Sequence, residues 1–287
     1  MGQNSRHRII LMMKPEIALL LDLVAIAGFF IGLNNINKLY LLIPLLISGS
    51  FASFSASLLN GAIEAKSDEH MQRTSWRKAS EIKSIIIFIA LILLGISILV
   101  SLELINIYTT LWIISGFLSY VFLYTIILKR RTYWNIVIGG ISGSFPALAG
   151  WSTVNSAISL DSLYIGFLIF LWTPVHFWAL ATKYKDDYKL AGIPMLPSIK
   201  SPDKVAMAIL LNAIILIFYS MIPLIFPNII RFGIIYEYAL VISTLMLAIN
   251  LIRYKMDPMK NAIKLFGSSN IYIMILMIGI ILSRFYP

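Results

Sequence analysis

The chain has 287 residues, of which 59% are hydrophobic and only 13% are charged. Because soluble domains have about a quarter of their residues charged, this composition excludes an ordinary soluble domain and predicts an integral membrane protein. The formal net charge of +10 could indicate nucleic-acid binding, but lysine and arginine gathered in the inner loops of a membrane protein explain it better, so no nucleic-acid partner is expected. The absence of cysteine excludes disulfides and thiolate metal sites.

Nine apolar segments are each long enough to cross the roughly 30 Å hydrocarbon core of a bilayer as a helix, at about 1.5 Å of rise per residue. In chain order they cover residues 9–33, 39–59, 84–102, 107–128, 135–155, 163–182, 205–227, 233–253 and 262–285. We therefore expect an all-α membrane protein, in which residues 1–287 form one domain of nine transmembrane helices embedded in the lipid bilayer.

Lysine and arginine favour one side of this predicted bundle. Of the 23 in the chain, all but Lys38, Arg231 and Arg284 lie at the N-terminus or in the loops after the second, fourth, sixth and eighth segments. Since positively charged loops stay in the cytoplasm, this asymmetry predicts a cytoplasmic N-terminus and an outside-facing C-terminus, in a multi-pass protein of the plasma membrane. The two long inner loops, about 60–83 and 183–204, hold most of the acidic residues.

The first acidic patch follows the second segment, in NGAIEAKSDEHMQRT. Asn60, Glu64 and Asp68 recur every four residues, so they share one face if the helix continues inward. A solvated helix end of mixed charge would explain these residues as well as a binding site would. Arg73 follows closely and adds a cation to the patch.

The second patch lies in residues 168–197, where an apolar helix with Trp172 and His176 runs into Lys183, Asp186 and Asp187. A histidine inside a transmembrane helix is costly and is therefore a functional hypothesis by default. A histidine satisfied between neighbouring helices is an equally good explanation of His176. At spacings of seven and four residues, His176, Lys183 and Asp187 share one helical face.

Two carboxylate sites on one side of the membrane, each surrounded by lysine and arginine, do not suit a proton pathway or an ion pore, which would place ionisable groups through the bilayer. They suit a phosphorylated ligand held through Mg²⁺, which binds one or two carboxylates together with phosphate oxygens. Lysine and arginine would then cover the remaining phosphate charge. A site at the mouth of an apolar bundle also favours a ligand with an apolar tail, such as a lipid diphosphate.

Four blocks of sequence carry a family resemblance: FLWTPVHFWALATKYKDDYKLAGIPMLP, LKRRTYWNIVIGGISGSFPALAGW, MMKPEIALLL near the start and NAIKLFGSSNIYI near the end. With them the chain resembles the UbiA superfamily of intramembrane prenyltransferases, and within it the branch that prenylates a porphyrin. The resemblance implies a UbiA-type bundle with two acidic loops on the cytoplasmic face. It also implies transfer of a farnesyl or longer prenyl group from its diphosphate to a vinyl group of protoheme IX, with addition of water, giving heme O and diphosphate.

The resemblance further implies Mg²⁺ as cofactor, with Asn60, Glu64, Asp68 and Asp187 as catalytic residues and the last three as metal ligands. The implied substrate-binding residues are Arg73, Lys129, Arg130 and Lys183 for the phosphates, Asp186 beside them, and His176 and Trp172 for the porphyrin, with His176 as a candidate iron ligand. Other membrane proteins of the heme pathway are candidate partners.

The chain departs from the family in its first motif, which usually has acidic residues four, six and eight positions after the asparagine. Glu64 and Asp68 supply two of these, but Lys66 places a cation at the third, and the usual Arg-Pro-Leu is Arg77-Lys78-Ala79. The departure concerns the number of metal ions and the affinity for the diphosphate. Two other functions remain open: prenyl transfer to a quinone or lipid acceptor, and a heme or lipid carrier without turnover.

Overall fold

The computed structural model describes residues 3–286 apart from 70, 73, 78 and 231, and every regular element among these residues is helical. Within the part of the chain that the structure describes, seven helical runs are long and apolar enough to cross a membrane: Ile36–Ile63, Ser75–Leu104, Ile107–Leu128, Leu160–Lys183, Pro202–Ile225, Ile234–Met256 and Pro258–Ser283. The prediction of an all-α integral membrane protein is confirmed.

The first half of the chain contains α1 (Gln3–Met12), α2 (Pro15–Gly32), η1 (Ile36–Leu41), α3 (Leu42–Ile63), α4 (Ala65–Asp68), η2 (Ser75–Arg77), η3 (Ala79–Ile82), α5 (Lys83–Leu104), α6 (Ile107–Leu118), η4 (Ser119–Leu128), α7 (Asn135–Gly139), η5 (Gly140–Ser144) and α8 (Phe145–Val154). The second half contains α9 (Leu160–Lys183), α10 (Lys185–Leu190), α11 (Leu196–Ile199), α12 (Pro202–Ser220), α13 (Ile222–Ile225), α14 (Ile234–Met256) and α15 (Pro258–Ser283).

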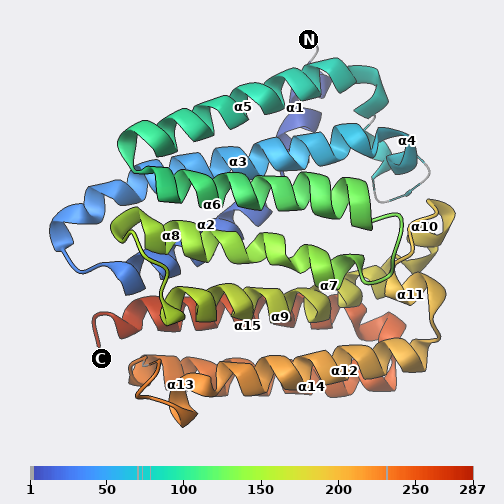
Figure 1. Cartoon of the computed structure of the whole chain (residues 1–287). Coiled ribbons are helices and arrows are strands. Elements are labelled where there is room, and N and C mark those ends of the chain that lie inside the picture. The colour runs from blue at the N-terminus through green and yellow to red at the C-terminus, as the bar shows by residue number, and fades with distance from the viewer. Residues whose placement is uncertain (1–2, 70, 73, 78, 231, 287) are drawn as a thin grey trace.

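The long helices lie side by side, and the short connecting helices gather at the two ends of the bundle (Figure 1). The connections that hold α4, α10 and α11 lie at one end, whereas α13 and the C-terminus lie at the other. We call the first of these the loop end. Helix α9 is central, because it packs against α2, α8, α12 and α15 and is the most buried of the candidate spans. The fold thus brings both acidic segments to the same end of the bundle.

The predicted segment 9–33 is divided into α1 and α2 at Lys14, the one described non-glycine residue with positive φ (52°). Proline disfavours the helical conformation in the residue before it, so the chain turns at Lys14 and α2 begins at Pro15. This left-handed conformation is rare for a residue with a side chain and marks a position worth functional attention.

The predicted segment 135–155 is also divided, into α7, the 3₁₀ helix η5 and α8. Pro146 lies at the start of α8, where its missing N–H costs nothing. Within α8, a Cβ on Gly150 would overlap the carbonyl oxygen of Ala25 in α2. Glycine is therefore needed here because the two backbones touch, and α2 and α8 pack more closely than larger residues would permit.

The last three predicted segments differ from the structure mainly at their ends. The segment 205–227 is shorter as a continuous helix, because α12 ends at Ser220 and Pro223 lies in the separate turn α13. The segment 262–285 begins earlier, at Pro258, because the Asp257 side chain caps α15 by accepting a hydrogen bond from the Lys260 N–H at 3.1 Å.

Candidate active site

The first acidic patch is buried at the loop end, where α3 passes into α4. Asn60, Glu64 and Asp68 are 2%, 4% and 4% exposed, so they do not form a solvated helix end. The amide of Asn60 donates to the hydroxyl of Thr125 in η4 at 3.2 Å. Buried polar groups at this depth require partners, and each of the three has one on a neighbouring element.

Both carboxylates of this patch are paired with a buried cation. Lys129 Nζ lies 2.6 Å from Glu64 Oε1 and 2.7 Å from Oε2, and Arg77 Nη1 lies 2.6 Å from Asp68 Oδ2. The side chains of Lys129 and Arg77 are 12% and 9% exposed. The site therefore holds two carboxylates and two cations in a setting where each charge depends on its partner.

The π-helical geometry of η4 places Lys129 opposite Glu64. The N–H of Lys129 donates to the carbonyl of Tyr124, five residues earlier, which is the π-helical pattern. Thr125 and Lys129 are four residues apart, as are Asn60 and Glu64, so the two helices meet in two successive contacts. Helix segments of this kind are frequent at functional sites.

The charges around Glu64 act on the pKa of its carboxyl. Burial alone would raise this pKa, but the charge and hydrogen bond of Lys129, with smaller contributions from Lys14 and Arg77, outweigh burial and lower it. For Lys129, burial works to lower the pKa, and the charge of Glu64 outweighs it and raises the pKa. Glu64 is held as a carboxylate and Lys129 as an ammonium, so the site is charged before any ligand arrives.

Lys66, which stands where the family usually has a carboxylate, is exposed, whereas Glu64 and Asp68 on either side of it are buried. Arg130 is largely exposed, and its guanidinium donates to the hydroxyl of Ser67 in α4. The departure at Lys66 therefore lies on the outer side of α4. Arg73, the remaining predicted phosphate ligand of this loop, lies outside the described residues.

The second acidic patch forms the short helix α10. Asp187 is partly buried, whereas Lys183 and Asp186 are exposed. Asp186 lines a surface cavity of about 160 Å³ together with Lys185 and Lys189. Of the predicted residues in this patch, Asp187 is therefore the one that turns toward the interior.

The two loops meet at the loop end. Met71 from the first loop and Tyr188 from α10 belong to the same apolar core cluster, together with Tyr124 of η4. Tyr188 also acts electrostatically on Lys129, the partner of Glu64. The expectation that two distant segments build one site is thus supported through Lys129, on which both Glu64 and Tyr188 act, although the described Asp, Glu and His side chains form no cluster of three able to hold a metal.

His176 is buried (8% exposed) in an aromatic clamp between α9 and α15. Its ring lies 4.3 Å from the rings of both Trp172 and Phe266, centroid to centroid. His176 Nδ1 lies 3.2 Å from Ser269 Oγ, and the Ser269 hydroxyl donates to the carbonyl of Phe266 at 2.7 Å. Because that hydroxyl proton is used, His176 Nδ1 is the donor, which leaves Nε2 with its lone pair.

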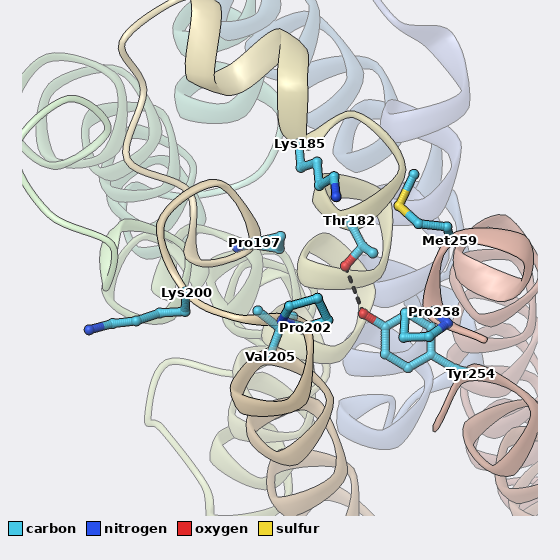
Figure 2. Close-up of a pocket in the computed structure, with 9 residues that line it drawn as sticks. All are labelled: Thr182, Lys185, Pro197, Lys200, Pro202, Val205, Tyr254, Pro258 and Met259. Carbon is cyan, nitrogen blue, oxygen red and sulfur yellow. Dashed lines mark hydrogen bonds between the residues drawn. The ribbon is translucent and has the colours of Figure 1, made fainter. Parts of the chain in front are cut away.

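A cavity of about 70 Å³ is lined by residues that include Thr182 of α9 and Tyr254 of α14. These two share a hydrogen bond of 2.7 Å (Figure 2). Lys185 extends toward Thr182, whereas Lys200 points away, and its ammonium lies 5.3 Å from the ring of Tyr133. A cavity that holds benzene has about 150 Å³, so this one is too small for a porphyrin or a prenyl chain. It is not the substrate site.

Three residues of the site were not identified from the sequence: Lys14, Arg77 and Thr125. Lys14 precedes a proline at the break between α1 and α2, and Arg77 follows the first motif within ten residues. Both are basic residues beside a membrane-helix end, so a search of every inner helix terminus for cations would have found them. Thr125 gave no signal, because only the π-helical geometry turns it toward Asn60.

Comparison with known proteins identifies the family. The sequence profile of the UbiA prenyltransferase family matches residues 22–276. The chain belongs to this family. It is 43% identical over 279 residues, 94% of each chain, to protoheme IX farnesyltransferase 2 of Picrophilus torridus. It is 41% identical over 220 residues, 76% of each chain, to protoheme IX farnesyltransferase of Sulfolobus acidocaldarius. Membership of this family makes the chain an enzyme of the prenyltransferase class.

Solved structures share the fold. A structure described as digeranylgeranylglyceryl phosphate synthase matches with a TM-score of 0.74 at 17% identity, covering 98% of both chains. A UbiA homologue from Archaeoglobus fulgidus bound to DMAPP and Mg²⁺ matches with a TM-score of 0.65 at 16% identity, covering 95% of this chain and 99% of that one. The helical arrangement described above is therefore the UbiA fold.

Proposed function

We propose that the protein transfers a farnesyl group from farnesyl diphosphate to a vinyl group of protoheme IX and adds water, giving heme O and diphosphate. The observation that carries the proposal is the 43% identity, over 94% of the chain, to a protoheme IX farnesyltransferase. The buried pairs of carboxylates and cations at the loop end, and the aromatic clamp around His176, support it. The length of the prenyl chain is part of what the test below measures.

The loop end would bind the diphosphate. Lys129, Arg77 and Lys14 all act on the first patch, and each can turn from a carboxylate to a phosphate oxygen. Arg130, Lys183 and, outside the described residues, Arg73 would add charge at the rim. Their task is electrostatic, because breaking the allylic C–O bond leaves its electron pair on the diphosphate, and fixed cations stabilise that charge. The apolar interior of the bundle would exclude stray water from the allylic carbocation that this bond cleavage forms.

The residues at this end fit a divalent metal. Glu64 Oε1 is buried and accepts no hydrogen bond from the described residues, although Lys129 Nζ lies close to it. A buried carboxylate oxygen that is ion-paired but not hydrogen-bonded could exchange its ammonium partner for a hard cation, and Mg²⁺ needs only one or two carboxylates beside phosphate oxygens and water. Glu64 and Asp68 would hold Mg²⁺, which would neutralise the leaving diphosphate. Asp187 of α10 forms no three-residue cluster with them among the described residues, so it would join them only when the diphosphate is bound. Asn60 would orient the complex.

His176 would bind the porphyrin substrate. Its Nε2 keeps a lone pair, and Trp172, Phe266 and Ser269 fix the orientation of the ring, so Nε2 would be the atom that ligates the heme iron. Trp172, Phe177 and Trp178 offer further aromatic surface for the porphyrin or the allylic cation. If His176 is a ligand, His176→Ala should change the optical spectrum of bound protoheme. A wild-type spectrum for the folded variant would remove this role and leave the transferase proposal intact.

The deciding experiment is mass analysis of heme extracted from cells that express the chain. A heme heavier by one prenyl unit and one water confirms the function and measures the length of the prenyl group. Protoheme alone, with the protein present in the membrane and farnesyl diphosphate supplied, would contradict it. A screen of quinone and lipid acceptors with labelled prenyl diphosphate would then identify the acceptor, and the absence of Mg²⁺-dependent diphosphate release would indicate a carrier.

The proposal includes nine membrane segments, the seven candidate spans together with the divided segments 9–33 and 135–155. The N-terminus and the loop end would face the cytoplasm, and the C-terminus would face the outside of the plasma membrane. Other heme-pathway proteins of the same membrane could receive the product. Because the chain has no cysteine, single cysteines can be placed at Ser201 and Ser156. Only Ser156→Cys should react with an impermeant thiol reagent in intact cells, and the reverse result would invert the topology.

A further inference from the structure

Asp22 is a carboxylate at an unusual depth. It lies eight residues into α2, and among the described residues it is the one carboxylate more than a turn from either end of a long helix. Its Oδ2 accepts a hydrogen bond from the Ser50 hydroxyl of α3 at 2.6 Å. No ion pair is formed between Asp22 and the described cations. A carboxylate inside a membrane bundle is costly, and one that is held by a single hydroxyl indicates a functional partner.

The second oxygen of Asp22 lies close to Gly49 of α3. Oδ1 lies 3.4 Å from the position of a Cβ on Gly49. Gly49 and Asn60 are eleven residues apart, which is three helical turns, so they share one face of α3. Ile47 lies two residues before Gly49, on the opposite side, and is 40% exposed as expected for a lipid-facing residue. The Asp22 carboxylate therefore looks along the face that carries the first acidic patch.

This face of α3 is packed near Asn60, where Ala56 is buried against Phe117 and Val121. It is looser toward Gly49, because both Ser53 and Gly49 are partly exposed despite facing away from Ile47. The separation between Asn60 and Gly49 is about 16 Å along the helix axis.

The reaction proposed above needs a proton acceptor inside the bundle. Prenyl transfer to the vinyl group leaves a carbocation on the carbon next to the porphyrin ring, and water must add there. Glu64 and Asp68 are paired with Lys129 and Arg77 at the loop end. Asp22 has an oxygen that these cations do not engage.

We propose that Asp22, held by Ser50, positions the water that completes heme O and accepts its proton. The water oxygen forms the new C–O bond with its lone pair, and one water proton passes to Asp22 Oδ1. The allylic C–O bond has already broken, with its electron pair on diphosphate, so the sum is heme, farnesyl diphosphate and water giving heme O, diphosphate and one proton. No oxidant or reductant is required.

The proposal rests on the function proposed above, and one experiment separates the two. Purified wild-type protein and Asp22→Asn receive Mg²⁺, farnesyl diphosphate and protoheme IX, and both released diphosphate and the masses of the heme products are measured. The variant should form heme O on the order of 10²-fold more slowly, the usual contribution of a general base. Its prenylated product should become the alkene that is lighter by one water, because the cation then loses a proton from carbon.

Heme O in wild-type amount and proportion from Asp22→Asn would overturn the role of Asp22. Absence of any prenylated heme from the wild type would instead overturn the proposed function. Asp161→Asn, a carboxylate at the far end of α9, is the matched control and should leave the product ratio unchanged. Ser50→Ala keeps the carboxylate and removes its donor, so it should give a smaller shift to the alkene. If Asp22→Asn does not fold, an unchanged product ratio for Ser50→Ala overturns the proposal.

Discussion

Replacing Lys129 by methionine should destabilise the protein through the charge that it leaves behind on Glu64. At the 2.6 Å between Lys129 Nζ and Glu64 Oε1, two unit charges attract by about 6 kcal/mol at an effective dielectric constant of about 20. Burial of both groups offsets part of this attraction. Removing one partner of a buried pair typically costs about 3–5 kcal/mol, because the other charge stays buried and uncompensated.

The assay is unfolding by denaturing detergent in mixed micelles, without substrate, for Lys129→Met, Glu64→Gln and the double variant. The sum of the stability losses of the two single variants should exceed the stability loss of the double variant by about 3 kcal/mol, because the double variant leaves no buried charge. Arg131→Met is the control, since Arg131 lies two residues after Lys129 but is exposed, and it should change stability by less than about 0.5 kcal/mol. Losses that simply add would refute the buried pair.

The same pair fixes how its contribution depends on pH. The pKa of Glu64 is lowered from 4.5, so the contribution of Glu64 to the free energy of unfolding is present above that value and is lost as the pH falls through the folded pKa. The pKa of Lys129 is raised from 10.5, so its share is present below that value and is lost as the pH rises through the folded pKa. From about pH 5 to pH 10 the contribution of the pair to the stability of the wild type should therefore be constant. In Lys129→Met the burial of Glu64 is no longer offset by Lys129 and raises the pKa of its carboxyl, so the variant should lose further stability as the pH rises through that pKa, which unfolding at a series of pH values measures.

Two further predictions follow from burial and backbone contact. Gly150→Ala should cost about 1–3 kcal/mol or more and lower the yield of folded protein, because its Cβ would overlap the Ala25 carbonyl. Gly95→Ala, where no atom lies within 4 Å of the new Cβ, should be neutral or stabilising by up to about 1 kcal/mol, and equal losses for both would refute the close packing. Asp68→Asn should weaken Mg²⁺-dependent release of diphosphate at least about tenfold, because it removes a buried charged partner. Lys66→Ala should change that release less than about twofold, and a larger effect would place the exposed Lys66 in the site.

Hydropathy predicted the helical membrane class and most helix positions, because burial in lipid leaves a long apolar run. It predicted the two divided segments as continuous, since an apolar run does not reveal a backbone turn. The turn at Lys14 could be expected from Pro15, but its consequence could not, because the effect of Lys14 on Glu64 depends on tertiary structure. Charge patterning likewise identified both acidic loops, and the mutual approach of the loops came only from packing.

The candidate site shows where such prediction ends. A four-residue spacing correctly placed Asn60 and Glu64 on one face, because α3 is a regular α-helix to Ile63. Thr125 and Lys129 are also four residues apart, and a regular α-helix would predict a common face for them. The direction of that face, however, is set by the π-helical geometry of η4, whose hydrogen bonds span five residues. Each turn with an extra residue rotates everything beyond it, so the sequence alone could not show that Lys129 meets Glu64. Asp22 was not singled out from the sequence, although a lone carboxylate within an apolar run can be recognised there. Only the structure shows that its Oδ1 lies beside Gly49 of α3.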